Sequence, residues 1–400
     1  MEYKKLNKLF YEKQSNYAEV YKQRFSAPFT EHLNFEIKQF NHDKSFPAFF
    51  CYSNEMFLLM EAIYKKFANL LIFINSVPSV VLYQFASLCM IDEVHSTSNI
   101  EGIHSTRQEL KNILENKDKH SRFSSIFNKY GLLLSNQTIV FNTAEDIRKL
   151  YDEFIHKEVV WNNPADALDG KIFRKESVDV RKKSGKIVHQ GLYPEDKIIE
   201  AVNAALDMVN NTNLPVLVRI AVFHYYFAYI HPFYNGNGRM ARFITSCYLA
   251  KHFHYLLGLR LSITINSDKN NYYKLLHETD LEINRGDLTP VILGFMSIIS
   301  KTLDNIEAIL KRKTEQLEKY RKKILELVLD DYLMQSLYDL LLQASLFAGH
   351  GITIKEIIKI TGKARGTIDK KIKSIPQNHI IIRKNKQNFY RLNMMIFKNQ

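Results

Sequence analysis

The stretch HPFYNGNGRMAR, from His231 to Arg242, combines residue types that could do chemistry on a phosphate. Pro232 should end an apolar helix and leave His231 at its C-terminal end, and a glycine-bearing turn at 236–238 should open a new helix. Free N–H groups at the start of that helix favour an anion. Arg239 and Arg242, three residues apart on one helical face, could fork onto phosphate oxygens. The stretch therefore predicts a phosphate site.

A histidine beside a phosphate site suits general-base catalysis. Imidazole titrates near neutral pH, so His231 could accept a proton from a hydroxyl whose oxygen attacks phosphorus. An isolated histidine near a helix end more often hydrogen-bonds a backbone carbonyl, but the spacing of this stretch favours the catalytic interpretation. The sequence contains no GxxxxGK[ST] motif, which argues against a P-loop enzyme.

The stretch resembles the signature of the Fic family: His, any residue, Phe, any residue, Asp or Glu, Gly, Asn, Gly or Lys, Arg, two residues, Arg. All positions match but one, and the resemblance covers about residues 91–300. It implies a Fic helical bundle that transfers AMP from ATP, with Mg²⁺, to a Ser, Thr or Tyr hydroxyl of a target protein or of the enzyme itself. In that comparison His231 is the general base. The phosphates would be held by Gly236, Asn237, Gly238, Arg239 and Arg242.

Asn235 is the one departure, because it stands where the family places the Asp or Glu that holds magnesium. An amide oxygen attracts this hard divalent ion less strongly than a carboxylate does. Two interpretations remain open. One is a slow or differently tuned transferase, and the other is a catalytically silent Fic-fold protein that senses nucleotide and acts as a DNA-binding regulator.

An upstream segment, Thr97-Ser-Asn-Ile-Glu101-Gly102, resembles the inhibitory helix of the same family. A glutamate carried on a helix could pair with the fork of Arg242 and take the place of the γ-phosphate of ATP. The resemblance thus implies that Glu101, with Thr97, restrains the enzyme. The alternative is that Thr97 caps a helix and Glu101 is an ordinary surface residue.

Two further segments add to the expected site. Sequence alternation around a glycine-bearing turn at 177–189 predicts a small β-hairpin, which we call the flap. By the resemblance, the flap would hold an extended segment of the target through main-chain pairing. The flap residues are Ser177, Val178, Val180, Ile187, Val188 and His189. Downstream, Tyr272 and Tyr273 could flank an adenine, although tyrosines on a helix also commonly pack in a core.

The elements that must position these residues are mostly helices. With 14 glycines and 9 prolines in 400 residues, the composition predicts an ordered, mainly α protein. Amphipathic helices are expected at 143–157 and, almost wholly apolar, at 215–231. We expect four parts, namely an N-terminal helical region (1–90), a catalytic core with its inhibitory helix (91–300), a linking helix (301–331) and a winged helix-turn-helix domain (332–400).

The C-terminal part carries most of the excess positive charge. Residues 353–400 contain twelve lysines and arginines against two acidic residues. Basic residues crowd the expected second helix of the motif and the wing: Lys363, Arg365, Lys370, Lys371, Lys373, Lys384 and Lys386. Contact with the phosphates of DNA requires such a face. A solvated face of a protein-binding or dimer module is the alternative.

The remaining features concern the environment of the protein. Three scattered cysteines and a charged N-terminus without a signal-peptide pattern predict a cytoplasmic protein. The apolar stretch 67–91 is interrupted by polar residues and Pro78, so a buried helical pair is expected there and no membrane span. A heptad stripe at 303–327 could form a homodimeric coiled coil or pack against its own domain.

Overall fold

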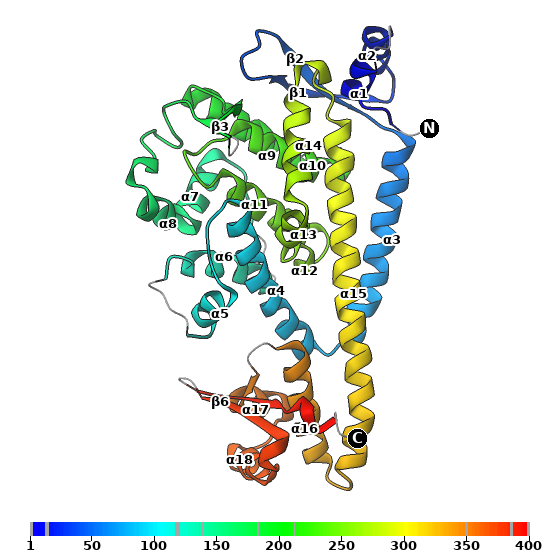
Figure 1. The fold of residues 1–400 in the computed structure, drawn as a ribbon, viewed down its shortest axis with the longest axis vertical. Helices are drawn as coiled ribbons and strands as arrows, with labels where there is room; N and C mark the ends of the chain where they lie inside the picture. The colour runs from blue at the N-terminus through cyan, green and yellow to red at the C-terminus, as the bar shows by residue number, and fades with distance from the viewer. Residues whose placement is uncertain are drawn as a thin grey trace. The chain divides into compact units, whose positions relative to one another are not determined.

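The computed structural model describes residues 3–12, 16–116, 121–135, 137, 139–181, 184–211, 213–348, 351–384 and 387–397. The protein is mainly α-helical, as predicted from its composition, and its described residues also form three small sheets (Figure 1). The chain divides into two compact units, Met1–Phe67 with Asp92–Leu303, and Ala68–Ile91 with Asp304–Gln400. All residues of the predicted phosphate site belong to the first unit.

The first unit contains most of the helices. They are α1 (Leu6–Tyr11), α2 (Tyr17–Phe25), α5 (Arg107–Asn116), α6 (Ser124–Leu134), α7 (Ala144–Phe154), α8 (His156–Asn162), α9 (Glu195–Asn211), α10 (Val216–Ile230), α11 (Asn237–His252), α12 (Tyr255–Gly258), α13 (Leu261–Ser267) and α14 (Lys269–Asp280), with the 3₁₀ helices η1 (Pro164–Asp166) and η2 (Glu282–Asn284). Three long helices pass from one unit to the other: α3 (Asn54–Ser76), α4 (Ser79–Ile100) and α15 (Thr289–Leu327).

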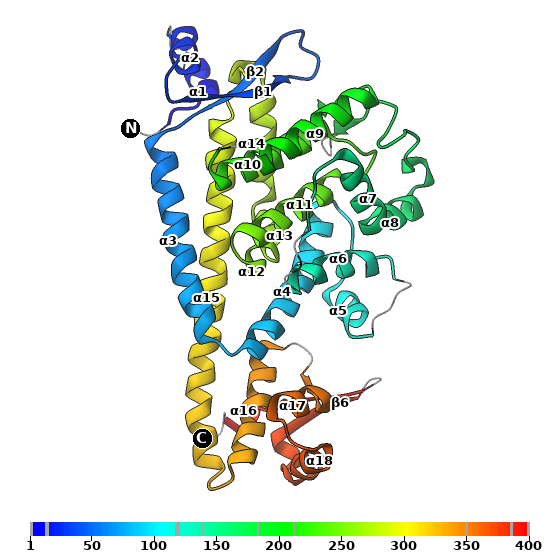
Figure 2. The ribbon, with the colours of Figure 1, turned by 180° about the vertical axis from the view of Figure 1, so that it is seen from behind.

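The N-terminal region contains a pair of strands that the sequence analysis did not foresee. Strand β1 (Thr30–Lys38) pairs antiparallel with β2 (Ser45–Cys51), and Figures 1 and 2 show this hairpin at the same end of the unit as α1 and α2. Phe49 of β2 is fully buried and exchanges backbone hydrogen bonds with Gly286 and Leu288. The hairpin is thereby joined to the chain just before α15.

The core of the first unit is built around α10, which packs against α9 and α11. Nearly every residue of α10 is buried, as expected for the apolar segment 215–231. The predicted helix at 143–157 is present as α7, followed directly by α8. Thr143 caps α7 in a capping box with Asp146, because each side chain accepts a hydrogen bond from the other residue's backbone N–H.

The second unit has the element order expected for a winged helix-turn-helix. Its elements are α16 (Tyr332–Phe347), β5 (Ile352–Thr353), α17 (Ile354–Thr361), α18 (Arg365–Ser374), η3 (Gln377–His379), β6 (Ile380–Lys384), β7 (Asn388–Leu392) and η4 (Met394–Phe397). The sheet order is β5-β7-β6, all antiparallel. The short strand β5 was not predicted. Lys386, predicted at the wing tip, lies outside the described residues.

The heptad stripe of the linking helix is used within the chain. That helix begins at Thr289, inside the expected core, and the stripe residues Leu303, Ile306, Leu310, Leu317 and Ile324 are buried. Lys313, which interrupts the stripe, donates to the carbonyl of Leu346 near the end of α16. Packing inside the chain therefore accounts for these five residues of the stripe, whereas Leu327 at its end is 38% exposed. No helix among the described residues is both long enough and apolar enough to cross a membrane.

Candidate active site

His231 terminates α10 in a left-handed backbone conformation, with φ of 54° and ψ of 59°. A non-glycine residue adopts this conformation only where its surroundings hold it. Arg174 supplies the hold, since its Nε and Nη2 donate to the carbonyl oxygen of His231 at 3.0 and 2.9 Å. Pro232 then prevents the helix from continuing. The histidine is presented where the sequence predicted it.

Arg174 also fixes both ends of the flap. Its Nη1 donates to the carbonyl of Glu176 and its Nη2 to that of Leu192, on either side of the two flap strands. The side chain is fully buried, and in the described part of the chain no carboxylate forms an ion pair with it. Arg174 was not predicted from the sequence. Its signal is a lone arginine after two apolar residues, Ile172 and Phe173, directly before the flap.

The imidazole of His231 is held in its neutral form. Burial, together with the nearby charge of His189, lowers the pKa of His231 to about 3. Its Nδ1 lies 3.3 Å from the carbonyl oxygen of Ala228, a contact that requires the proton on Nδ1. In that tautomer Nε2 carries the free lone pair, so His231 has the form that a general base needs at neutral pH.

The loop after His231 is locked by Asn237. Its Oδ1 accepts from the N–H of Phe233 at 2.9 Å, and its Nδ2 donates to the carbonyl of Phe233 at 2.7 Å. The Phe233 ring stacks on Tyr151 at 4.0 Å between centroids. The side chain of Asn237 thus shapes the loop of the predicted phosphate site. Only the backbone N–H of Asn237, in the first turn of α11, remains to donate to an anion.

The glycines of this loop permit close approaches. Gly236 has φ of 89°, and a Cβ there would lie 2.3 Å from Cδ1 of Ile155. A Cβ on Gly238 would lie 2.2 Å from Oε1 of Glu101 and 3.0 Å from Nη1 of Arg242. A carboxylate therefore rests directly on the first turn of α11, where the free N–H groups and the helix dipole favour an anion.

Glu101 is held in that position by Arg242. The Nη2 of Arg242 donates to Oε1 of Glu101 at 2.7 Å and to the carbonyl of Thr97 at 3.0 Å, and its Nε donates to Oγ1 of Thr97 at 2.9 Å. The guanidinium is fully buried, whereas the Glu101 side chain is 28% exposed. Nη1 of Arg242 is buried without a hydrogen-bond partner among the described residues. The structure thus brings Thr97, Glu101, Gly238 and Arg242 together.

Arg239 has a different partner, which the sequence analysis missed. Its Nη1 forms an ion pair with Glu158 of α8, and each of the two side chains is 1% exposed. Nε of Arg239 is buried with no hydrogen-bond partner in the described ranges. The two arginines predicted to act as one clamp are therefore held by separate carboxylates. A glutamate in the otherwise apolar helix segment 158–160 is the only sequence signal for this pair.

Asn235 lies on the exposed side of the loop. Its Nδ2 donates to Oδ2 of Asp166 in η1 at 2.9 Å. The preceding residue, Tyr234, donates through its hydroxyl to Oδ1 of Asp169 at 3.0 Å. Two acidic residues of the segment before the flap thus contact two successive residues of the motif loop, and neither contact was foreseen from the sequence.

The flap is a two-stranded antiparallel hairpin of β3 (Asp179–Arg181) and β4 (Ile187–Gln190). Ser177 and Val178 precede β3, and the carbonyl of Val178 accepts from Gly191. The side chains of Val178, Val180, Ile187 and Val188 are half-buried. Residues 182 and 183 of the predicted turn lie outside the described residues.

His189 anchors the flap to the core and does not point outward. Its Nδ1 lies 3.3 Å from Oδ2 of Asp280, at the end of α14, and its Nε2 contacts the carbonyl of Tyr229 at 2.6 Å. Tyr225 donates to the other oxygen of Asp280 at 2.7 Å. Burial opposes the charged imidazole, but the Asp280 carboxylate outweighs it and raises the pKa of His189. Only the main chain of His189 is available for pairing.

The two tyrosines predicted beside an adenine have different surroundings. Tyr272 is buried, and its hydroxyl contacts Nε2 of His224, whose Nδ1 contacts Thr245. Tyr273 is 44% exposed and donates to the carbonyl of Ile100 at 3.2 Å, at the end of the helix that carries Glu101. Tyr272 therefore packs in the core, and Tyr273 lies beside the Glu101 segment.

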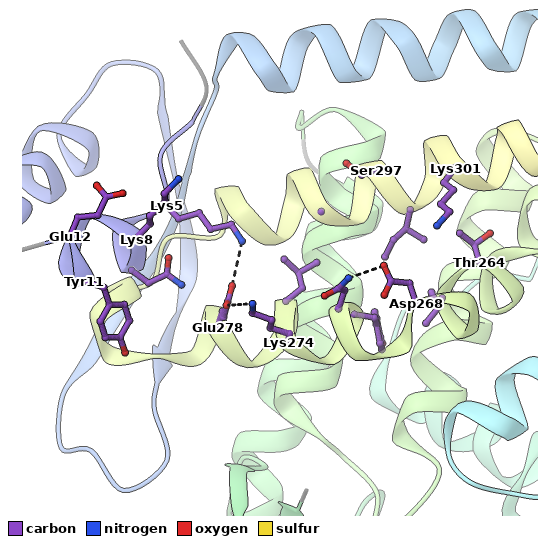
Figure 3. Close-up of a pocket in the computed structure, with 17 residues that line it drawn as sticks. Lys5, Lys8, Tyr11, Glu12, Thr264, Asp268, Lys274, Glu278, Ser297 and Lys301 are labelled. Atoms are coloured by element: carbon purple, nitrogen blue, oxygen red, sulfur yellow. Dashed lines mark hydrogen bonds and ion pairs between the residues drawn. The ribbon is translucent and has the colours of Figure 1, made fainter. Parts of the chain in front are cut away.

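A separate pocket lies between α1, α14 and α15 (Figure 3). Several of its polar side chains contact one another: Lys5 and Lys274 both contact Glu278, and Asn271 donates to Asp268. Neither His231 nor Arg242 lines it. Among the described residues no group of three or more His, Cys, Asp or Glu side chains is arranged to hold a metal ion.

Comparison with known proteins finds a family match in the part of the chain that contains the motif. Residues 141–249 match the sequence model of the Fic/DOC family. The chain is 24% identical over 219 residues to the protein adenylyltransferase Fic of Drosophila yakuba, a match that covers 53% of this chain and 40% of that protein. It is 32% identical over 114 residues to the protein adenylyltransferase Fic of Nematostella vectensis, covering 28% of this chain and 24% of that protein. The chain thus aligns with less than half the length of these relatives.

The fold has a counterpart among solved structures. A crystal structure of a Fic family protein from Desulfovibrio desulfuricans G20 superposes with a TM-score of 0.53 at 19% sequence identity, covering 86% of this chain and 97% of that chain. This likeness supports the predicted Fic helical bundle. The part of the chain that matches the Fic/DOC sequence model, residues 141–249, includes His231 and Arg242.

Proposed function

We propose that the protein is an adenylyltransferase that moves AMP from ATP to a Ser, Thr or Tyr hydroxyl of a protein and is restrained by Glu101. The observation that carries this proposal is the carboxylate of Glu101 resting on Gly238 and paired with Arg242. A helix start that holds one anion through N–H groups and a buried arginine is suited to hold another, such as a nucleotide phosphate.

In the proposed reaction the hydroxyl oxygen of the target attacks the α-phosphorus of ATP. A bond forms between that oxygen and phosphorus, the bond from the α-phosphorus to the bridging oxygen breaks, and pyrophosphate leaves. Nε2 of neutral His231 accepts the hydroxyl proton. Arg174 keeps the histidine in place through its carbonyl, and the N–H groups of the first turn of α11 stabilise charge on the phosphates.

Magnesium would neutralise charge on the phosphates of bound ATP. The residues at the loop fit a magnesium ion in their chemistry, because Asn235 offers an amide oxygen and Asp166 a carboxylate, and Mg²⁺ usually takes only one or two protein ligands beside phosphates and water. In this proposal Asn235 remains a magnesium ligand, and we expect turnover to be slower than in a variant with an acidic residue at position 235.

The flap gives the proposed target a place to bind. Its two strands form a sheet by themselves, so outer main-chain groups of β3 and β4 have no further strand beside them in the described chain. An extended segment of a target protein could pair with such an edge and bring its hydroxyl towards His231. The anchoring of the flap by Arg174 and His189 would keep this edge at a fixed distance from the base.

Incubation with ATP labelled at the α-phosphate tests the proposal. Replacing Glu101 with Gly should increase label transfer to protein, either to the chain itself or to a target in a cell extract, at least about tenfold because the anion site is vacated. The Glu101→Asp variant keeps the charge and serves as a matched control with low transfer. Adding His231→Ala to Glu101→Gly should abolish the label. Equal transfer by wild type and Glu101→Gly would contradict restraint by Glu101.

A second candidate function rests on the basic surface of α18. Lys363, Arg365, Lys370 and Lys373 are exposed on or just before this helix. We propose that this face binds the phosphates of duplex DNA, as the alternative regulator would require. Duplex binding should weaken steeply with added salt, and Lys370→Gln with Lys373→Gln should reduce the salt dependence. Lys65→Gln with Lys274→Gln, on exposed sites of the first unit, is the control. Absence of binding at low salt would remove this candidate.

A further inference from the structure

The charge missing at position 235 has a replacement close by. Asn235 is neutral, but its Nδ2 lies 2.9 Å from Oδ2 of Asp166. Asp166 comes from η1, which follows α8 and is far from the motif in sequence. The pair of side chains therefore carries the single negative charge that one acidic residue at position 235 would carry.

Asp166 is fixed at this position by its own segment. Asn163 caps η1, because its Oδ1 accepts from the N–H of Ala165 at 3.2 Å, and its Nδ2 donates to Oδ1 of Asp166 at 3.0 Å. Each oxygen of Asp166 thus accepts a hydrogen bond from a neutral amide, and no other donor to it is found in the described chain. Over the residues that the structure describes, no lysine, arginine or histidine forms an ion pair with Asp166. Among those residues its negative charge therefore has no basic counter-ion.

The neighbouring acidic residue, Asp169, has different hydrogen-bond partners. Oδ1 of Asp169 accepts from the hydroxyl of Tyr234 and from the N–H of Lys175, both at 3.0 Å. These hydrogen bonds lower the pKa of Asp169 against the opposing effect of burial. Asp169 therefore ties the motif loop to the start of the flap. The two aspartates, three residues apart, offer a matched pair for comparison.

We propose that Asp166 supplies the carboxylate ligand for the divalent metal of the bound nucleotide, with Asn235 as its amide partner. The proposal rests on the proposed nucleotide-binding function. A hard divalent ion favours an anionic oxygen, and Asp166 is the carboxylate within hydrogen-bond distance of the side chain at position 235. The oxygen and nitrogen of an asparagine amide can exchange places by rotation, so Asn235 can turn its Oδ1 towards a cation beside Asp166.

Metal binding can be measured without turnover. Mn²⁺, detected by electron paramagnetic resonance, is titrated into the full-length Glu101→Gly protein saturated with the non-hydrolysable analogue AMPPNP. Asp166→Asn should weaken Mn²⁺ binding about tenfold or more, as loss of a ligand carboxylate does. Asp169→Asn should leave Mn²⁺ affinity within about twofold, because that carboxylate is engaged by Tyr234. Unchanged Mn²⁺ affinity in Asp166→Asn would overturn the proposal.

A charge exchange separates a ligand from a residue that merely positions the loop. The double variant Asp166→Asn with Asn235→Asp keeps one carboxylate in the pair and should recover most of the Mn²⁺ affinity. If it stays as weak as Asp166→Asn while circular dichroism shows an intact fold, Asp166 acts on the loop and the proposal fails.

Nucleotide binding without metal distinguishes this proposal from the proposed function. AMPPNP binding is measured in the presence of EDTA for Glu101→Gly with and without Asp166→Asn. Equal affinities would show that the nucleotide site is intact in both variants. A loss of Mn²⁺ affinity would then be due to Asp166 itself. If AMPPNP binds none of the variants, the proposed function fails and the metal proposal fails with it.

Discussion

Two arginine–glutamate pairs on α11 differ in how their carboxylates are held. Arg239 and Glu158 are both sealed from solvent, with 1% exposure each. Arg242 is equally buried, but Glu101 is 28% exposed and stands at the end of α4, directly before Gly102 with its φ of 77°. A carboxylate that reaches solvent at a helix end can be exchanged for another anion at low cost. A sealed carboxylate cannot leave without stranding a buried charge.

From this difference we expect the largest loss of stability when Glu158 is replaced. Replacing Glu158 with Ala leaves the Arg239 guanidinium buried without a counter-charge and should lower the free energy of unfolding by about 3–5 kcal/mol. Urea denaturation followed by circular dichroism measures this loss. Glu101→Ala serves as the comparator and should cost less, since the Glu101 carboxylate is already 28% exposed and its partner retains both bonds to Thr97. Equal losses at the two sites would break the distinction.

The next effect concerns nucleotide binding. If the Glu101 carboxylate competes with a phosphate for Arg242, Glu101→Gly should bind ATP about tenfold to a hundredfold more tightly than wild type, a gain of about 1.4–2.7 kcal/mol. Isothermal titration calorimetry measures the affinity, and a larger ATP-dependent rise in melting temperature should accompany it.

Glu158 supplies the control for that measurement. Glu158→Gln keeps the shape of the side chain but removes its charge, and it should not tighten ATP binding, because Glu158 is not at the helix start. Tighter binding in Glu158→Gln would mean that both carboxylates compete with the nucleotide, and the contrast between the pairs would disappear.

Replacing Thr97, which also binds Arg242, should have a smaller effect on the Arg242–Glu101 pair. Thr97→Val removes the hydroxyl acceptor of Nε of Arg242 and should cost about 1–2 kcal/mol of unfolding free energy, because a buried charged donor is left unpaired. It should also loosen the hold on Glu101 and tighten ATP binding, but less than Glu101→Gly does. Thr97→Ser retains the hydroxyl and should behave as wild type in both measurements. A Thr97→Ser variant as unstable as Thr97→Val would assign the effect to packing.

Local sequence patterns were enough to predict the elements and residues whose structure depends on their neighbours in the chain. Pro232 and the glycines at 236–238 set the helix end and helix start around His231, and the alternation at 177–189 predicted the flap strands. The segment with Glu101 was found because its spacing resembles a known pattern. Physically, these features depend on backbone preferences that each residue carries with it.

The missed residues act across long separations. Glu158, Asp166 and Arg174 are each more than fifty residues from their partners in the motif. Their types alone, an acid in a helix or an arginine before a hairpin, are ordinary surface features until tertiary packing buries or aligns them. The β1–β2 hairpin escaped prediction for the same reason, because Phe49 is placed by hydrogen bonds to residues 286 and 288. Sequence periodicity carries no information about such contacts.

His231 gives the smallest expected effect, which is an absence of titration near neutral pH. Arg239 and Arg242 place two positive charges on α11. The difference between their ion pairs is independent of pH only if His231 does not become a third positive charge near them. With its pKa lowered to about 3, the folded protein binds no proton at His231 between pH 5 and 8, whereas the unfolded chain binds one below about pH 6.5. His231 therefore lowers stability as pH falls from 6.5, by at most about 1.4 kcal/mol per pH unit.

The nuclear magnetic resonance signal of the His231 ring carbon Cε1, assigned by its loss in His231→Ala, should stay constant from pH 8 to pH 5 in histidine-labelled protein. His189→Gln removes a neighbouring positive charge, but burial is the main cause of the low pKa, so the signal should still not move in that range. A midpoint near pH 6.5 would show that His231 is solvated and charged below that pH. The positive charge around the helix start would then grow as pH falls, and the hold on Glu101 would depend on the base as well as on Arg242.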